Sequence, residues 1–218
     1  MIDKILLFPY WLSLKLRHFL YDTGLKKVRS ADVPTICIGN ITVGGTGKTP
    51  HTEMLIRTLL QDEDWGEKNI AVLSRGYKRK TKGFQQVTAD GSAIAYGDEP
   101  LQIKKKFPQV TVAVDEKRVN GIEMLLKEQN PPQAVLLDDA FQHRYVNPGT
   151  NIVLMDYNRP IYEDALMPTG MLREPISSIS RAHVIIVTKC PKDIKPIDYR
   201  IVAKNLELRP YQRLYFTT

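Results

Sequence analysis

The chain has 218 residues, of which 43% are hydrophobic and 25% charged, and both values are ordinary for a globular protein. They exclude a disordered or fibrous chain, and the length allows one sizeable core with an appendage. No apolar run approaches the roughly 18 to 20 residues that cross a bilayer, so we do not expect a transmembrane protein. The two cysteines, Cys37 and Cys190, are too few for a disulfide framework and fit a reducing compartment.

Basic residues gather in two places and contribute to a net charge of +7. Residues 1–30 hold six lysines and arginines against two aspartates, a net charge of +4. Such patches attract phosphate groups of any kind, on nucleotides, nucleic acids or anionic lipids, so charge alone does not choose among them. The second patch consists of Arg75, Lys78, Arg79, Lys80 and Lys82.

The N-terminal segment, residues 1–30, is rich in apolar residues, and its pattern predicts a helix from about Pro9 to Tyr21 that ends before Gly24. A signal peptide is not expected, because the segment lacks a small-residue cleavage site. Two alternatives stay open from the residues alone: a helix that lies on an anionic membrane surface, and a helix packed on its own domain. On such a helix one face would carry Leu12, Leu16, Phe19 and Leu20.

After residue 31, short apolar runs alternate with helical patterns. This alternation predicts an α/β fold with a doubly wound, mainly parallel sheet, in one domain over residues 31–218. The expected strands are residues 35–39, 70–74, 110–114, 134–138, 152–156, 183–188 and 213–217, and the expected helices are residues 50–60, 99–107 and 116–128.

The first expected strand leads into a glycine-rich loop that ends in Gly47-Lys48-Thr49 and opens a helix, which is the context of a P-loop. In such a loop the glycines let backbone N–H groups face phosphates, and the helix N-terminus adds partial positive charge. Lys48 would reach the β- and γ-phosphates, and the Thr49 hydroxyl would bind Mg²⁺. The candidate phosphate-binding residues are Thr42, Val43, Gly44, Gly45, Thr46, Gly47, Lys48 and Thr49.

One position departs from the usual P-loop pattern, because Thr42 stands where the first glycine normally lies. We expect Gly44 and Gly45 to supply the flexibility instead.

A second nucleotide-binding element is the apolar run at residues 134–138, which ends in Asp138 and Asp139. An acid in this place can hold Mg²⁺ directly or through water, opposite the P-loop hydroxyl. We expect one of the two aspartates to do so, and the sequence does not choose between them.

Five motifs together resemble the tetraacyldisaccharide 4'-kinases, which phosphorylate an acylated glucosamine disaccharide 1-phosphate in bacterial lipid A synthesis. The resemblance implies a P-loop NTPase-like fold, ATP and Mg²⁺ as cofactors, and transfer of the γ-phosphate to the 4'-hydroxyl of a tetraacyldisaccharide 1-phosphate. The motifs are GNITVGGTGKTP at 39–50, SRGYKRK at 74–80, GDEP at 97–100, DDAFQHR at 138–144 and LREP at 172–175.

The resemblance also implies roles for single residues. Asp98 matches an aspartate that helps to deprotonate the sugar hydroxyl, and Arg75 opens a basic motif that contacts phosphate. Arg173 and Glu174 match a pair near the active site, where they would contact substrate. The catalytic set implied in this way is Lys48, Arg75, Asp98, Asp138 and Asp139.

The family's membrane-surface helix matches residues 1–30, and this match favours the interfacial alternative for the N-terminal segment. The expected partners are therefore the acylated disaccharide 1-phosphate lipid and an anionic membrane surface, with no nucleic acid and no protein partner. The expected location is peripheral, on the cytoplasmic side of the bacterial inner membrane.

Two departures from the family pattern concern residue 140 and the length. Ala140 stands where the family usually has glycine. Family members run well beyond 218 residues and carry, in their later part, a histidine that partners the position of Asp98, so we expect this chain to be a fragment. His143 belongs to a different motif and does not replace that histidine.

The alternative function is a P-loop ATPase switch of the partition or metal-insertion type. Those proteins usually place a lysine just before the glycine pair, where this chain has Val43. A nucleic-acid binder is disfavoured, because the chain lacks a basic and aromatic binding motif of known type.

Overall fold

The structure, a computed structural model, describes residues 2–66 and 68–218, and it describes side chains from Pro9 onward apart from residue 67. The side chain of Lys4, one of the six basic residues of the N-terminal segment, lies outside this part. The chain forms two compact units that interleave along the sequence. Unit 1 comprises Met1–Val28, Gly39–Gly47 and Thr150–Thr218, and unit 2 comprises Arg29–Ile38 and Lys48–Gly149.

Unit 2 is built on strands in the order β3-β4-β2-β5-β1. β1, β5, β2 and β4 run parallel to their neighbours, and only the short β3 is antiparallel, to β4. Parallel strands bring their carboxyl ends to one edge of the sheet, and the register places Ile38 opposite Asp138 there. The bounds are β1 Thr35–Gly39, β2 Ile70–Ser74, β3 Gln85–Gln86, β4 Thr111–Val114 and β5 Ala134–Asp138.

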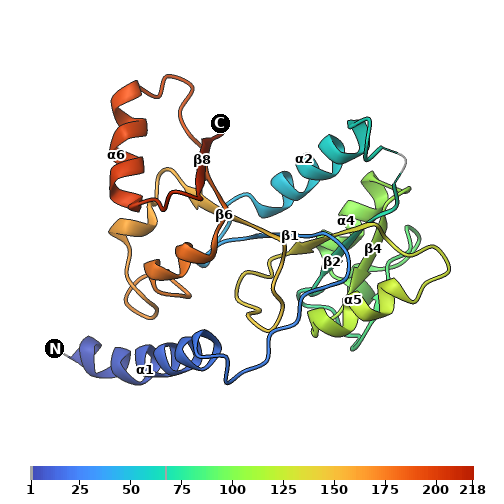
Figure 1. Cartoon of the computed structure of the whole chain (residues 1–218), viewed down its shortest axis with the longest axis horizontal. Helices are drawn as coiled ribbons and strands as arrows, with labels where there is room; N and C mark the ends of the chain where they lie inside the picture. The colour runs from blue at the N-terminus through green and yellow to red at the C-terminus, as the bar shows by residue number, and fades with distance from the viewer. Residues whose placement is uncertain (1, 67) are drawn as a thin grey trace. The chain divides into compact units, whose positions relative to one another are not determined.

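Helices cover both faces of these strands (Figure 1). Successive strand residues point to opposite faces. Val72 packs in the core cluster with Ile56 of α2 and Ile103 of α4. Its neighbour Leu73 lies against Gly121 of α5, on the other face. The bounds are α2 Lys48–Gln61, α3 Ala93–Tyr96, α4 Asp98–Lys106 and α5 Arg118–Leu126.

Unit 1 contains three parallel strands, β6 (Thr150–Asp156), β7 (Val184–Thr188) and β8 (Arg213–Phe216). Asp156 and Thr188 are register partners at the carboxyl ends of β6 and β7. Helix α6 (Pro196–Leu206) packs Tyr199 edge-on against Phe216 of β8, with ring centroids 4.4 Å apart. Two 3₁₀ helices, Ile161–Glu163 and Ile176–Arg181, connect β6 to β7.

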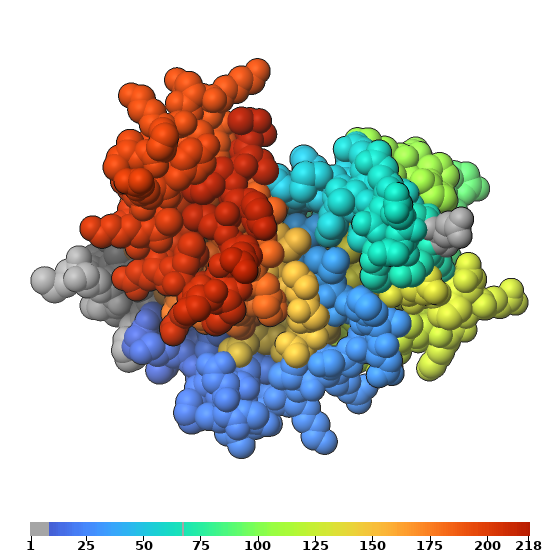
Figure 2. Space-filling view, turned by 45° about the horizontal axis from the view of Figure 1, so that its top comes forward, coloured from blue at the N-terminus to red at the C-terminus, as the bar shows by residue number. Residues whose placement is uncertain are grey.

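Helix α1 (Ile2–Asp22) belongs to unit 1 and buries one narrow side of its surface. Leu14 is buried, and the Tyr10 hydroxyl donates to the Arg173 carbonyl at 3.0 Å. The described part of the helix lies at the molecular surface (Figure 2). Its outward side carries exposed Trp11, Leu12, Leu16 and Phe19. Among the described residues, no helix has the length and apolar character needed to cross a membrane.

The predicted α/β class with a mainly parallel sheet and an N-terminal helix is confirmed. All seven expected strands are present within two residues of their predicted ends, and the three expected core helices are present. The start of α1 was predicted wrongly, because Pro9 lies inside the helix and not in its first turn. The patterns also missed β3, α3 and α6. The division at residue 30 stays a prediction.

Both cysteines are buried free thiols. Burial raises the pKa of Cys37 to about 12, so this thiol stays protonated and inert at neutral pH.

Candidate functional site

The glycine-rich loop that was predicted to bind phosphates, residues 42–49, is called the phosphate loop here. Its first residues pair along their backbone with residues 171–173, within unit 1. The Val43 N–H donates to the Met171 carbonyl at 2.8 Å, and the Arg173 N–H donates to the Ile41 carbonyl at 2.7 Å. Thr42 and Leu172 form an antiparallel bridge between these two bonds. This side of the loop is therefore held by main-chain hydrogen bonds, which do not depend on the side chains.

Two glycines of the loop are required by backbone conformation. Gly44 has a φ of 109° and Gly47 a φ of 86°, values that residues with a side chain rarely adopt. Among the described residues of the loop, Thr42 does not have a positive φ. The departure at Thr42 is thus tolerated because the usual first position needs no glycine here, and of the two glycines expected to compensate, only Gly44 carries this requirement.

Asn40 links the loop to the motif at residues 172–175. Its side-chain amide donates to the Thr46 hydroxyl at 2.8 Å, and its carbonyl oxygen accepts a hydrogen bond from the Arg173 guanidinium. The next residue, Glu174, is fully buried and forms an ion pair with Arg181. Arg173 and Glu174, the two residues predicted to contact substrate, therefore lie next to the start of the loop.

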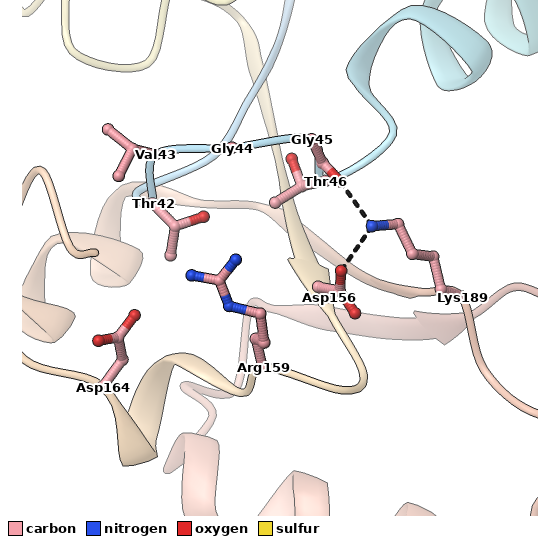
Figure 3. A pocket seen from close by; sticks show the side chains of 9 residues that line it. All are labelled: Thr42, Val43, Gly44, Gly45, Thr46, Asp156, Arg159, Asp164 and Lys189. Atoms are coloured by element: carbon pink, nitrogen blue, oxygen red, sulfur yellow. Dashed lines mark hydrogen bonds and ion pairs between the residues drawn. The ribbon is translucent and has the colours of Figure 1, made fainter. Parts of the chain in front are cut away.

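A polar pocket of about 100 Å³ opens beside the same loop, within unit 1 (Figure 3). Lys189 lies on one side, with its ammonium between the loop and Asp156, and the Arg159 guanidinium points toward the loop from below (Figure 3). The lining residues are Thr42, Val43, Gly44, Gly45, Thr46, Asp156, Arg159, Asp164 and Lys189.

In unit 2 the loop lysine lies beside one of the predicted acids. Lys48 is the first residue of α2, and its Nζ is 3.9 Å from Oδ1 of Asp139. The Asp139 N–H donates to the Ile38 carbonyl, and its φ of 45° is uncommon for a residue with a side chain. Thr49, half-buried, follows in the first turn of α2.

Asp138 is the more buried of the two acids and lacks partners for part of its carboxylate. The Ser74 hydroxyl donates to Oδ2 at 3.3 Å, while Oδ1 is buried with no hydrogen-bond partner among the described residues. Burial raises the pKa of Asp138 to about 6, and the negative charges of Glu99 and Asp139 add to this rise. Arg118 and Lys48 act in the opposite direction, but less strongly.

Arg118 supports Asp138 from below. Its guanidinium is completely buried, donates to the Asp138 carbonyl at 3.0 Å and also donates to the Asp115 carbonyl. Burial lowers the pKa of this arginine, and Asp138 acts against that change. A buried guanidinium on two main-chain carbonyls fixes the ends of β4 and β5 relative to each other.

Asp98 is exposed at the first position of α4, one residue earlier than the predicted helix start. The helix N-terminus favours a negative charge there. Glu99, in the same turn, is close enough to raise the pKa of Asp138, so this end of α4 lies near the acids. Arg75 is exposed directly after β2. Arg79 differs from the rest of its basic motif, because its buried side chain pairs with Glu116 and donates to the Gly83 carbonyl.

Within unit 2 the structure thus brings together Lys48, Asp138 and Asp139, with the N-terminus of α4 nearby. The motifs alone did not single out Ser74, Glu99 or Arg118. Ser74 and Glu99 do lie inside quoted motifs, so a signal was available for them. Arg118 gives no signal in sequence, because a lone arginine in a helix normally lies on the surface.

The acids suit a divalent cation. Mg²⁺ prefers oxygen ligands and is usually bound through one or two carboxylates together with phosphate oxygens. The buried Oδ1 of Asp138, without a partner among the described residues, is an oxygen of this kind. No group of three or more acidic, histidine or cysteine side chains that could hold a metal occurs in the described part of the chain, so a site here would have fewer protein ligands.

Comparison with known proteins identifies the family of the chain. The profile of the tetraacyldisaccharide-1-P 4'-kinase family matches residues 4–214. The chain belongs to this family. It is 56% identical over 211 residues to the tetraacyldisaccharide 4'-kinase of Phocaeicola vulgatus, and 58% identical over 210 residues to that of Bacteroides fragilis. Each match covers 96% of this chain and 56% or 54% of the relative, so the chain spans a little over half the length of these tetraacyldisaccharide 4'-kinases.

A solved structure of the same family has the same fold. This chain is similar to the crystal structure of LpxK from Aquifex aeolicus in complex with ATP, with a TM-score of 0.76 and 29% sequence identity. The match covers 100% of this chain and 82% of the crystallised chain.

The raised pKa of Asp138 predicts a pH-dependent cost to stability. The folded chain holds this proton up to pH about 6, whereas the unfolded chain loses it near the ordinary value of 3.8. The folded state therefore loses stability as the pH rises from about 4 to 6, by at most about 3 kcal/mol. Asp138→Asn removes this loss, so its melting temperature at pH 7 should exceed that of the parent by several degrees.

Thermal melts of the parent and of Asp138→Asn at pH 4 and pH 7 check this. The difference should shrink toward pH 4, and Asp64→Asn, at an exposed position, should melt like the parent at both values. A variant that is less stable than the parent at pH 7 would contradict the expectation.

Proposed function

We propose that the protein is an ATP-dependent kinase that transfers the γ-phosphate to the 4'-hydroxyl of a tetraacyldisaccharide 1-phosphate. The observation that carries this proposal is the position of the loop lysine, because Lys48 Nζ lies 3.9 Å from the Asp139 carboxylate. A cationic side chain beside a pair of acids, of which Asp138 is buried, suits phosphoryl transfer with a metal ion. The ATP in the related LpxK crystal supports the choice of nucleotide.

In this proposal residues 42–49 bind the phosphates of ATP. Lys48 neutralises the β- and γ-phosphates and leaves its contact with Asp139 when they arrive. Thr49, Asp138 and Asp139 would hold Mg²⁺, which would neutralise charge on the transferring group. The unpartnered Oδ1 of Asp138 and the hydrogen bond from Ser74 support Asp138 as the direct ligand.

The acceptor is handled by residues outside the loop. Asp98, exposed at the N-terminus of α4, orients the sugar hydroxyl and takes its proton. Arg75, exposed after β2, contacts phosphate oxygen. Arg173 and Glu174 contribute to the substrate side of the site. The contact of Arg173 with Asn40 supports a role in which this arginine also holds the loop in place. Glu174 is fully buried and pairs with Arg181, so it would act on the substrate side through its neighbours and not by direct contact.

The membrane surface is proposed as the place where the protein meets its lipid. Helix α1 buries Leu14 and leaves Leu12, Leu16 and Phe19 exposed, an apolar row at helical spacing. Basic side chains accompany this row, and the Lys15 ammonium lies 4.2 Å from the centre of the Trp11 ring. Aromatic and apolar side chains with lysines and arginines are typical of helices that lie in an anionic membrane surface. On this basis we propose that the protein is peripheral. The cytoplasmic side of the membrane is proposed from the family resemblance alone.

The alternative of an ATPase switch is disfavoured by family membership, since the matched relatives carry kinase names.

The first test concerns nucleotide chemistry. Lys48→Ala removes the loop cation that reaches the phosphates, so transfer from ATP to the tetraacyldisaccharide 1-phosphate should be abolished while the fold persists. Circular dichroism checks the fold, and Lys105→Ala, at an exposed position of α4, is the matched control that should keep parental activity. Transfer near the parental rate in folded Lys48→Ala would contradict the assignment of the loop as the ATP-binding loop.

The second test separates the acceptor side from the nucleotide side. Asp98→Ala should lower turnover with little change in ATP affinity, because an interaction made with the reacting hydroxyl acts mainly in the transition state. Asp138→Ala should weaken binding of ATP in the presence of Mg²⁺. Calorimetric titration of both variants decides the point, and an equal loss of ATP binding in the two would show that Asp98 is not an acceptor residue.

The third test concerns α1 and anionic vesicles. Each basic residue near an anionic surface contributes on the order of 1 kcal/mol, so neutralising four of them should weaken vesicle binding strongly, as should raised salt. The combined change of Leu12, Leu16 and Phe19 to serine should weaken binding even at low salt. The four basic residues to be changed to glutamine are Lys15, Arg17, Lys26 and Lys27.

Co-sedimentation with vesicles at low and high salt measures this. The double change of Ile197 and Ile201 to serine is the control, because these two residues are also exposed and apolar at helical spacing, but on α6. Equal sedimentation of all variants would show that α1 is an ordinary helix packed on its domain and does not bind the vesicles.

A further inference from the structure

Lys189 connects the phosphate loop to the end of β6, and none of the motifs above includes it. It is the first residue after β7, and its ammonium donates to the Gly45 carbonyl at 2.7 Å and to Oδ2 of Asp156 at 2.6 Å (Figure 3). All three residues belong to unit 1.

The backbone conformation of Lys189 and the contact of its ammonium with Asp156 together define its position. Its φ of 58° lies in the left-handed region, which residues with a side chain occupy at some cost in free energy. At its other end Asp156 also accepts the Asn158 N–H at 3.0 Å. Burial acts to raise the pKa of Asp156, but hydrogen bonds from Lys189 and Asn158 outweigh it and lower the pKa. The carboxylate is therefore charged at neutral pH and attracts the ammonium.

The residue before Lys189 makes a parallel contact to the next carbonyl of the loop. The Thr188 hydroxyl is buried and shares its proton between the Thr46 carbonyl, at 3.1 Å, and the Met155 carbonyl, at 3.3 Å. Two successive carbonyls of the loop, at positions 45 and 46, are thus bound by two successive residues at the end of β7. The C=O and N–H of a planar trans peptide point in opposite directions. Fixing these two carbonyls therefore fixes the direction of the N–H groups at positions 46 and 47.

We propose that Lys189, anchored by Asp156, is a positioning residue of the phosphate loop that sets the direction of its backbone N–H groups. The proposal rests on the proposed function, in which this loop binds ATP. Lys189 does not touch the transferred phosphate in this role. It acts through the Gly45 carbonyl, which it holds on the side of the loop that faces the pocket in Figure 3.

The exchange experiment tests the anchor without nucleotide. Lys189→Met keeps the length of the side chain and removes its donors, so amide hydrogen exchange in residues 44–47 should become at least about tenfold faster than in the parent, because a charge-assisted hydrogen bond is lost. Lys189→Arg keeps the charge and should restore part of the protection. Lys192→Met, three residues further at an exposed position, is the matched control and should exchange like the parent in this segment.

The binding experiment tests the consequence for nucleotide. Titration of the chain with ATP and Mg²⁺ should show affinity about tenfold weaker for Lys189→Met, and weaker by less for Asp156→Asn, which keeps the carbonyl contact but loses the charge. In turnover assays Lys189→Met should raise KM for ATP more than it lowers kcat. Thr188→Val, nearly the same shape without the hydroxyl, provides a second variant should Lys189→Met fail to fold.

The outcomes separate this proposal from the proposed function. Parental exchange at residues 44–47 in Lys189→Met overturns the anchor whether or not the chain binds ATP. Faster exchange with parental ATP affinity overturns its part in nucleotide binding. If the parent itself shows no ATP binding, the proposed function fails, and the exchange experiment still decides whether Lys189 holds the loop.

Discussion

The parallel pairing of β1 with β5 is the constraint on which the acidic part of the site depends. Because the two strands run in the same direction and Ile38 lies opposite Asp138, the carboxyl end of β1 at Ile38 and the pair of acids lie at one edge of the sheet. The hydrogen bond from the Asp139 N–H to the Ile38 carbonyl continues this pairing by one residue. Lys48, the first residue of α2 in the same unit, lies with its Nζ 3.9 Å from Oδ1 of Asp139.

The two acids carry features that lower the stability of the fold. Asp138 is buried with one oxygen unpartnered among the described residues, and Asp139 takes an uncommon backbone conformation. Each feature costs stability in the free protein. Arg118 offsets part of that cost by binding two main-chain carbonyls beneath the acids. Binding of a cation would remove the free-energy cost of burying a carboxylate oxygen without a partner.

Sequence patterns predicted the strands well, because buried parallel strands are short continuous apolar runs. They failed where no such signal exists. β3 has only two residues, and α6 exposes Ile197 and Ile201, so neither shows a clear apolar period. The same contrast holds in the site. The motifs singled out Lys48 and the acids, whose roles stay predictions, whereas Arg118 and Lys189 donate to main-chain carbonyls that only the folded chain brings within reach. Thr42 shows the reverse case, an apparent departure that the backbone conformation explains.

The interleaving of the two units along the chain has a consequence for synthesis on the ribosome. Unit 2 draws on Arg29–Ile38 and Lys48–Gly149, so all of its residues exist once position 149 has been added. Unit 1 needs Met1–Val28 and Gly39–Gly47 together with Thr150–Thr218. Since chains fold in domains as they emerge, the strands of unit 2 can assemble first, while the apolar side chains of α1 and the phosphate loop still wait for β6 and β7. For that interval α1 lacks the carboxyl-terminal part of unit 1, including the Arg173 carbonyl that accepts a hydrogen bond from Tyr10 in the finished fold, so the side of the helix that becomes buried is still exposed to solvent.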